Sequence, residues 1–296
     1  MKTFDPVQMA IPFFVLAVIL EIVLARMGKA SARYEAKDTA MSLTLGLGSS
    51  IAGALLGGVI FAATVWVYQH RIFTIPMTAV WAWVILFFAE DLTYYGFHRI
   101  AHERRFWWAS HVNHHTSTHY NLSTALRQTW TGGVAGTWLL WLPLSFLGFP
   151  PAMVAIQKGI SLIYQFWIHT EAIKRMPKWF EAVFNTPSHH RVHHARNARY
   201  LDANYAGILI IWDRMFGSFV PETHRPTYGL TKNIDTYNPI RVAFGEFVNI
   251  GRDVRRAHGL KAKLGHIFGP PGWQPAGARL DPAQPNPELL SPVRRS

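Results

Sequence analysis

Three short motifs of the 296-residue chain concentrate histidine in a way that suits metal binding. "HRIAH" places two histidines four residues apart, and "HVNHH" and "HRVHH" each repeat a spacing of three and four. Residues three or four apart lie on one helical face, so each motif can direct its imidazoles at one ion. Eight imidazoles exceed what one ion takes and match two ions with nitrogen ligands. The motif histidines are His98, His102, His111, His114, His115, His190, His193 and His194.

The exclusive use of imidazole in these motifs limits the metal chemistry. Neutral histidine leaves an ion its full charge and suits iron, copper or zinc. A dizinc hydrolase, the main alternative, needs an activated water in a site open to solvent. Here the motifs adjoin long apolar segments. A site at the end of an apolar cavity favours attack on an inert C–H bond by activated oxygen, so we interpret the pattern as two iron ions.

Asp91 precedes His98 by seven residues, on the same face of the predicted helix. We predict that it accepts a hydrogen bond from the outward ring nitrogen of a histidine ligand and so fixes the tautomer of that ligand. On this basis Asp91 is a candidate catalytic residue. The alternative is that Asp91 and its neighbour Glu90 simply reach interfacial water, because an acid at membrane depth is costly without a partner.

The composition indicates a membrane protein. The chain is 50% hydrophobic and 16% charged, has no cysteine and carries a net charge of +12. The absence of cysteine excludes disulfides and thiolate metal sites. A basic chain can bind nucleic acid or an anionic membrane face. The long apolar runs favour the membrane and argue against nucleic acid.

The elements that must position the histidines are predicted to be helical throughout. A membrane-spanning helix needs about 20 mostly apolar residues. We predict an all-α, multi-pass transmembrane bundle in one domain, 1–269, with a histidine-rich cytosolic helical cap over 97–131 and 170–269. The segment 270–296 is rich in Pro, Ala and Arg and is predicted to be disordered. The spans are predicted at 7–25, 42–67, 76–96, 132–149 and 152–169. For the first of these, the alternative interpretation is a cleaved signal peptide.

Basic residues follow the first, third and fifth predicted spans. By the positive-inside rule these segments are cytoplasmic, which puts every histidine motif on the cytoplasmic side. His169, alone in "YQFWIHTEAI", then lies at the depth of the motifs and becomes a predicted ninth ligand rather than an isolated interface residue. The sequence does not distinguish a bacterial cytoplasmic membrane from the endoplasmic reticulum.

The order of the motifs "HRIAH", "HVNHH" and "HHRVHH" resembles the fatty acid hydroxylase/sterol desaturase superfamily of integral-membrane diiron oxygenases. The resemblance covers about residues 90–220. "HYNLSTALRQ" and "RYLDANYAGILIIWDRMFGSF" are similar to its alkylglycerol monooxygenase branch, and Glu103 also matches that branch. The position of His119 departs from the branch, where it is more often acidic or small, so the substrate end is left open.

This resemblance implies two irons and O₂ as reactants, with the eight motif histidines as ligands and His169 as a further one. It also makes Glu103 a second catalytic candidate. The implied reaction is hydroxylation of an alkylglycerol, fatty-acyl or ornithine-lipid substrate, with sterol or lipid desaturation as the alternative. Because no reductase motif is present, electrons must come from an external donor such as a pterin, a ferredoxin or a cytochrome b5-like protein.

Two functions of other classes compete with this interpretation. A bis-His haem electron carrier needs single histidines on facing helices inside the bilayer, whereas these are paired at helix ends. A metal transporter needs ionisable residues near the centre of several spans, and only Glu21 is so placed.

Overall fold

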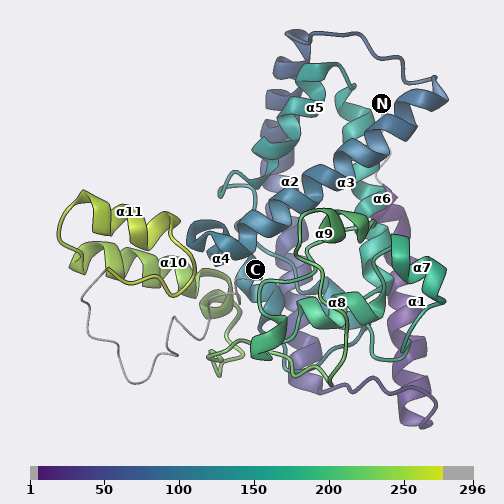
Figure 1. The fold of residues 1–296 in the computed structure, drawn as a ribbon, viewed down its shortest axis with the longest axis vertical. Helices are drawn as coiled ribbons and strands as arrows, with labels where there is room; N and C mark the ends of the chain where they lie inside the picture. The colour runs from purple at the N-terminus through teal and green to yellow at the C-terminus, as the bar shows by residue number, and fades with distance from the viewer. Residues whose placement is uncertain (1–5, 276–296) are drawn as a thin grey trace.

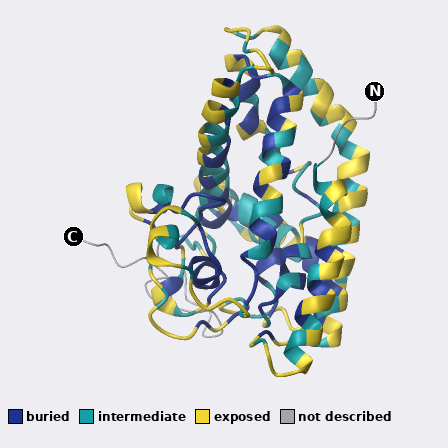
Figure 2. Ribbon diagram, turned by 90° about the vertical axis from the view of Figure 1, so that its right-hand side faces the viewer, coloured by how far each residue is buried: buried dark blue, intermediate teal, exposed yellow. Residues whose placement is uncertain are grey.

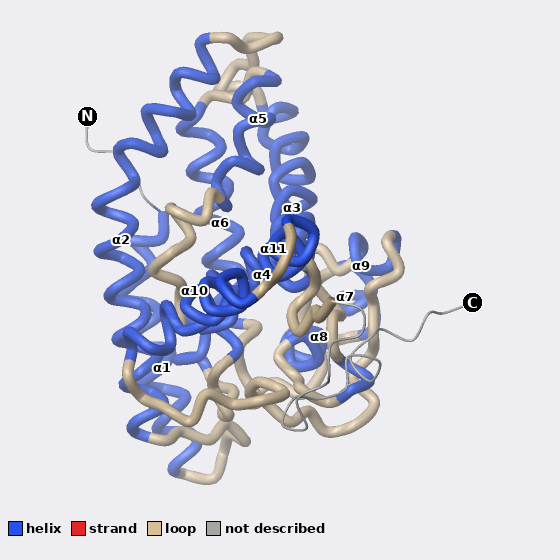
Figure 3. The backbone as a smooth tube through the Cα atoms, turned by 90° about the vertical axis from the view of Figure 1, so that its left-hand side faces the viewer, coloured by secondary structure: helices blue, strands red, loops and turns tan. Residues whose placement is uncertain are grey.

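The structure, a computed structural model, describes residues 6–275. Within this range it is built from helices, turns and two isolated β-bridges, without any β-strand, which confirms the predicted all-α class (Figure 1; Figure 3). Four long helices supply the frame, and the other elements are clustered against it. The long helices are α1 (Pro6–Arg26), α2 (Ala36–Gln69), α3 (Val80–Glu103) and α6 (Pro151–Trp167).

Two of these helices, α1 and α2, are long and apolar enough to cross a membrane. They contain the predicted spans 7–25 and 42–67, and many of their large apolar side chains are exposed, as in Leu16, Leu55 and Val59. α3 includes most of the predicted span 76–96 and continues without interruption to Glu103. His98 and His102 therefore lie on the same helix, one turn apart.

Residues 132–149 do not form one continuous helix, in contrast to the prediction. The segment is divided into the 3₁₀ helix η3 (Thr137–Trp141) and the six-residue helix α5 (Leu142–Leu147), which is about 9 Å long. Gly136 and Gly148 adopt positive φ angles of 69° and 123° at its turns, a region open mainly to glycine. Hydropathy alone does not register these breaks.

The remaining elements, which include the 18-residue helix α10, lie beside the lower part of this frame (Figure 1). Figure 2 shows that buried residues gather in this lower part of the molecule, around α8, while the outer helices are largely exposed. These elements are α4 (Arg105–His111), η1 (Val112–His115), η2 (Leu122–Leu126), α7 (Lys178–Val183), α8 (Pro187–His193), η4 (Ala198–Tyr200), α9 (Ile211–Met215), α10 (Pro239–Arg256) and α11 (Leu260–Phe268).

The helical pair α10–α11 is fastened to α4 by Arg105. Its guanidinium forms ion pairs of 2.7 Å with both Glu246 and Asp253. Beyond α11, Trp273 packs against His266 with ring centroids 5.1 Å apart. The first residues of the segment predicted to be disordered thus contact α11, and 276–296 lie outside the described residues.

Gly46 allows α2 to approach the loop that follows the second histidine motif. A Cβ atom at this position would lie 2.7 Å from the carbonyl oxygen of Leu126. We expect Gly46→Ala to lower the free energy of unfolding by about 1–3 kcal/mol, because backbone must shift to remove the overlap. The matched control is Gly53→Ala, also in α2, where nothing lies within 4 Å. It should be neutral or stabilising by up to about 1 kcal/mol in the same thermal or denaturant titration.

Candidate metal centre

Four separate segments bring the nine predicted histidine ligands together. Two of these histidines lie at the end of α3, and three lie in the α4–η1 segment. Three more lie in α8 and its C-cap, and His169 directly follows the C-cap of α6. Eight of the nine are buried, and His111 is half-buried. α8 can begin abruptly at this point because Pro187 occupies its first turn, where a missing N–H costs nothing.

The imidazoles separate into two compact groups. Within each group the candidate ligand atoms all lie within 4.8 Å of one another. Each group combines side chains from different elements, so neither exists until the chain has folded. The first group is His98, His102, His111, His115 and His193, and the second is His114, His169, His190 and His194.

The spacing of the ε nitrogens fits metal coordination. The Nε2 atoms of His98 and His111 are 3.0 Å apart, and that of His169 lies 3.1 Å from His114 and 3.0 Å from His190. Two nitrogens bound at right angles to one ion at about 2.1 Å would be about 3.0 Å apart. The buried Nε2 atoms of His102 and His193 have no hydrogen-bond partner among the described residues. Both atoms belong to the first group. Such atoms require a partner, and an ion in that group would provide it.

Backbone carbonyls fix the tautomer of four of these imidazoles. Because a carbonyl oxygen only accepts, the Nδ1 atom facing it must carry the proton, and Nε2 is left as a metal ligand. In each of these hydrogen bonds a histidine Nδ1–H group donates to a backbone carbonyl oxygen. The pairs are His98 with Tyr205 at 2.9 Å, His114 with Arg127 at 3.1 Å, His169 with Gln165 at 2.7 Å and His193 with Ala203 at 3.0 Å.

Burial also favours the form of histidine that binds metal. Desolvation lowers the pKa of His114 to about 4 and that of His193 well below its usual range, although the carbonyl of Arg127 or Ala203 acts in the opposite direction. Both imidazoles are therefore neutral at pH 7, as ligation requires.

The carboxylate of Asp91 does not contact a histidine, in contrast to the prediction. It is fully buried and accepts hydrogen bonds from the backbone N–H groups of Ile208 and Leu209 and from the Trp212 indole, at 2.8–3.0 Å. Asp91 thus ties α3 to the segment before α9. Its connection to His98 is indirect, since that segment begins at Tyr205, whose carbonyl oxygen accepts the hydrogen bond from the Nδ1–H group of His98.

Glu103 lies at the edge of the site rather than inside it. Its side chain is 41% exposed and forms an i,i+4 ion pair of 2.8 Å with Arg99. Arg99 in turn donates to the hydroxyl of Tyr95. Glu103 follows His102 in the chain, but no hydrogen bond joins it to either histidine group in the described structure.

Two buried ion pairs near the site were not predicted. Arg127 pairs with Asp38 at the start of α2 at 2.7 Å, and Arg191, inside the third motif, pairs with Glu222 at 2.7 Å. Their partners are far away in sequence, so no local pattern indicates them. The only indication in the sequence was the position of Arg191 inside the third motif.

Asp213 supports the carbonyl that orients His98. Its buried carboxylate accepts from the N–H groups of Tyr205 and Ala206 at 2.8 Å and from the Ser218 hydroxyl at 2.7 Å. We expect Asp213→Asn to weaken metal affinity about 10–100-fold, because its NH₂ group would face a backbone N–H and shift the loop. Competition with a chelator measures this. The control is Asp235→Asn at an exposed position, and equal affinities for both variants would contradict the role of Asp213.

Comparison with known proteins agrees with this geometry. The fatty acid hydroxylase family model matches residues 83–218, a range that includes all nine histidines, Asp91, Glu103 and Asp213. Residues 83–218 are a fatty acid hydroxylase domain. The resemblance predicted from the motifs is thereby confirmed. No solved structure matches the chain.

The similarity to individual relatives extends beyond residues 83–218. The chain is 39% identical over 286 residues to the alkylglycerol monooxygenase of Homo sapiens, covering 96% of this chain and 64% of that protein. It is 41% identical over 275 residues to that of Danio rerio, covering 93% and 61%. An ornithine lipid hydroxylase of Rhizobium tropici is 27% identical over 125 residues, covering 42% of this chain and 38% of that protein. The chain therefore spans less than two thirds of the length of these relatives.

Proposed function

We propose that this chain is a membrane-bound diiron enzyme that hydroxylates a C–H bond of a lipid with O₂. The observation that carries the proposal is the pair of buried histidine groups, each with ligand atoms within 4.8 Å of one another. An all-nitrogen set of this kind suits iron. A dizinc hydrolase would need a site open to water, whereas eight of the nine ligands are buried.

In this proposal the chain holds two irons, one in each histidine group, and the bound pair supplies the activation of O₂ that an inert C–H bond requires. The protein's own contribution is orientation and exclusion of water. The carbonyls of residues 127, 165, 203 and 205 hold four imidazoles in the ligating tautomer. The burial of the ligands keeps water away and favours one approach for the substrate.

For the substrate we propose an alkylglycerol or a similar lipid with a long chain. This rests on the names and identities of the alkylglycerol monooxygenases, which match almost the whole chain. The exposed apolar surfaces of α1 and α2 support a membrane location. We further propose a multi-pass arrangement in which the histidine groups face the cytoplasm, as the distribution of basic residues favours.

The proposal is tested by metal analysis and turnover of the purified chain. We expect about two irons per chain, one for each histidine group, and O₂ uptake that depends on an alkylglycerol. Because the donor is external, reduced pterin, reduced ferredoxin and reduced cytochrome b5 are supplied in parallel reactions. Iron-loaded protein that consumes no O₂ with any donor and substrate lipid would refute the proposal, and zinc in place of iron would favour a hydrolase.

A further inference from the structure

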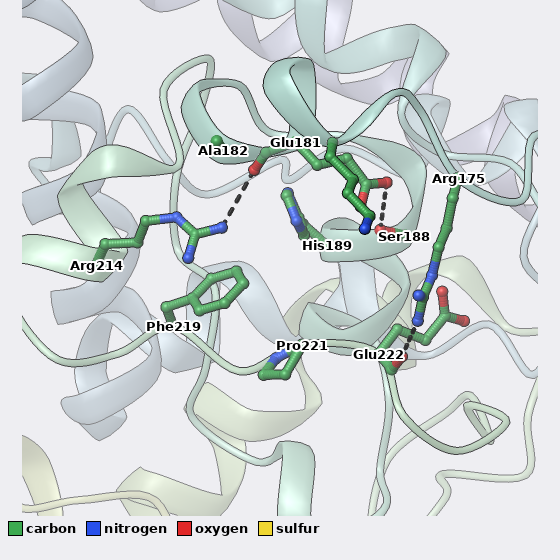
Figure 4. Close-up of a pocket in the computed structure, with 10 residues that line it drawn as sticks. Arg175, Glu181, Ala182, Ser188, His189, Arg214, Phe219, Pro221 and Glu222 are labelled. Atoms are coloured by element: carbon green, nitrogen blue, oxygen red, sulfur yellow. Dashed lines mark hydrogen bonds between the residues drawn. The ribbon is translucent and has the colours of Figure 1, made fainter.

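A pocket of about 450 Å³ lies against α8. Its wall includes residues of α7, α8 and the chain on either side of Phe219. In Figure 4 Arg214 and Arg175 reach the pocket from opposite sides, and His189 and Ser188 lie between them. None of these residues belongs to either histidine group.

Three cations line this pocket without a carboxylate partner. Arg214 lies 3.7 Å from the ring centroid of Phe219 and donates to the backbone carbonyl of Glu181 at 3.2 Å. Arg175 donates to the backbone carbonyl of Glu222. Within residues 6–275, no ion pair includes either arginine or Lys178. Their positive charges are therefore available to a ligand.

The two acids of the pocket are already engaged. The carboxylate of Glu222 receives two hydrogen bonds from Arg191, at 2.7 and 3.0 Å. The Oε1 atom of Glu181 accepts from the Met176 N–H at 3.0 Å and the Ser188 hydroxyl at 2.9 Å. The Glu222 charge is paired with Arg191, and the one remaining negative charge, that of Glu181, is outnumbered by the three cations. The pocket therefore has a net positive charge and attracts anions.

One nitrogen of a buried imidazole in the wall lacks a hydrogen-bond partner. His189 is 3% exposed, and its Nδ1 atom has no hydrogen-bond partner among the described residues. A buried polar nitrogen of this kind is normally satisfied by a ligand or a bound water. Unpaired cations and an unsatisfied polar atom together are what a site for a small oxyanion requires.

The surroundings of the pocket indicate where the oxyanion comes from. Trp179 of α7 is 69% exposed, and Met215 and Phe216, at the end of α9, are 67% and 50% exposed. Exposed apolar side chains beside basic ones favour a lipid surface. We propose that this pocket binds the phosphate of an anionic lipid headgroup, with Arg175, Lys178 and Arg214 as its cationic contacts.

The proposal is tested by lipid titration of the detergent-purified full chain, followed by native mass spectrometry. The probes are phosphatidic acid and a diacylglycerol with the same acyl chains. We expect Arg214→Gln and Lys178→Gln each to weaken phosphatidic acid binding about tenfold, the loss of one charge-assisted contact, and to leave diacylglycerol binding unchanged. The control is Arg252→Gln, an exposed arginine on α10, which should bind as the wild type does.

Two results would overturn the proposal in different ways. Wild-type affinity for phosphatidic acid in both pocket variants would show that the pocket is not the phosphate site. Displacement of the lipid by soluble glycerol 3-phosphate at comparable concentration would assign the site to a soluble phosphate ester instead. Lys178 has no ion pair to lose, so its variant separates lost binding from lost folding. Iron content is measured in parallel, and it should not change.

Discussion

Replacing His114 with alanine is expected to lower iron content by at least one ion per chain and to abolish lipid hydroxylation. His114 belongs to the group of four, where its Nε2 lies 3.1 Å from that of His169. Four ligands are few for iron, so the loss of one leaves a weak site. Removing a partner that only orients a ligand already costs about 10–100-fold, and the loss of a ligand should exceed that range. Iron analysis and product formation measure the two effects.

His119→Ala provides the control for this result. His119 is only five residues away but lies outside both histidine groups. Its variant should retain iron and activity. If His114→Ala kept its full iron content and hydroxylated at the wild-type rate, the group of four would not be a catalytic metal site. Equal amounts of both variants in the membrane exclude a difference in folding.

The second large effect is expected from Arg127→Leu, which should lower stability by about 3–5 kcal/mol. Arg127 is 2% exposed, and its guanidinium binds the Asp38 carboxylate at 2.7 Å and the Ser42 hydroxyl at 3.1 Å. The substitution leaves the Asp38 carboxylate buried without its cation, which is the costly way to break such a pair. The midpoint of thermal unfolding should fall by about 6–20 °C.

A double variant distinguishes the stranded charge from other causes. In Asp38→Leu/Arg127→Leu both charges are replaced by apolar groups, and such replacements are often close to neutral. Most of the lost stability should therefore return. A double variant as unstable as Arg127→Leu would mean that other contacts of Arg127, such as its 2.8 Å hydrogen bond to Thr116, cause the loss.

The grouping of the histidines could be anticipated from sequence because its basis is local. A spacing of three or four fixes a shared helical face wherever the helix forms. His169 has no such neighbour, and only the sidedness of the basic residues associated it with the motifs. Its place in the group of four depends on the packing of α6 against distant segments, which the spacing of residues does not contain.

The orientation of the ligands could not be anticipated. Asp91 was expected to hold an imidazole because a carboxylate is a recognisable acceptor, but backbone carbonyls occupy that role at four histidines. Every residue has a carbonyl, so no residue type marks these positions. The break in 132–149 was missed for a related reason, since hydropathy averages over glycines whose φ angles end the helix.

The 34 residues of α2 make it about 51 Å long, whereas the hydrocarbon core of a bilayer is about 30 Å thick. One face of its first turns is buried, at Asp38, Met41, Ser42 and Leu45, and the rest of the helix exposes apolar side chains such as Leu55. In the proposed topology this helix lies against lipid beyond its first turns, and those first turns hold Arg127 through Asp38 and Ser42. In the proposed topology, a thicker or thinner bilayer would change the height of the iron pair relative to the acyl chains. We expect membrane thickness to influence which carbon of a lipid chain is oxidised.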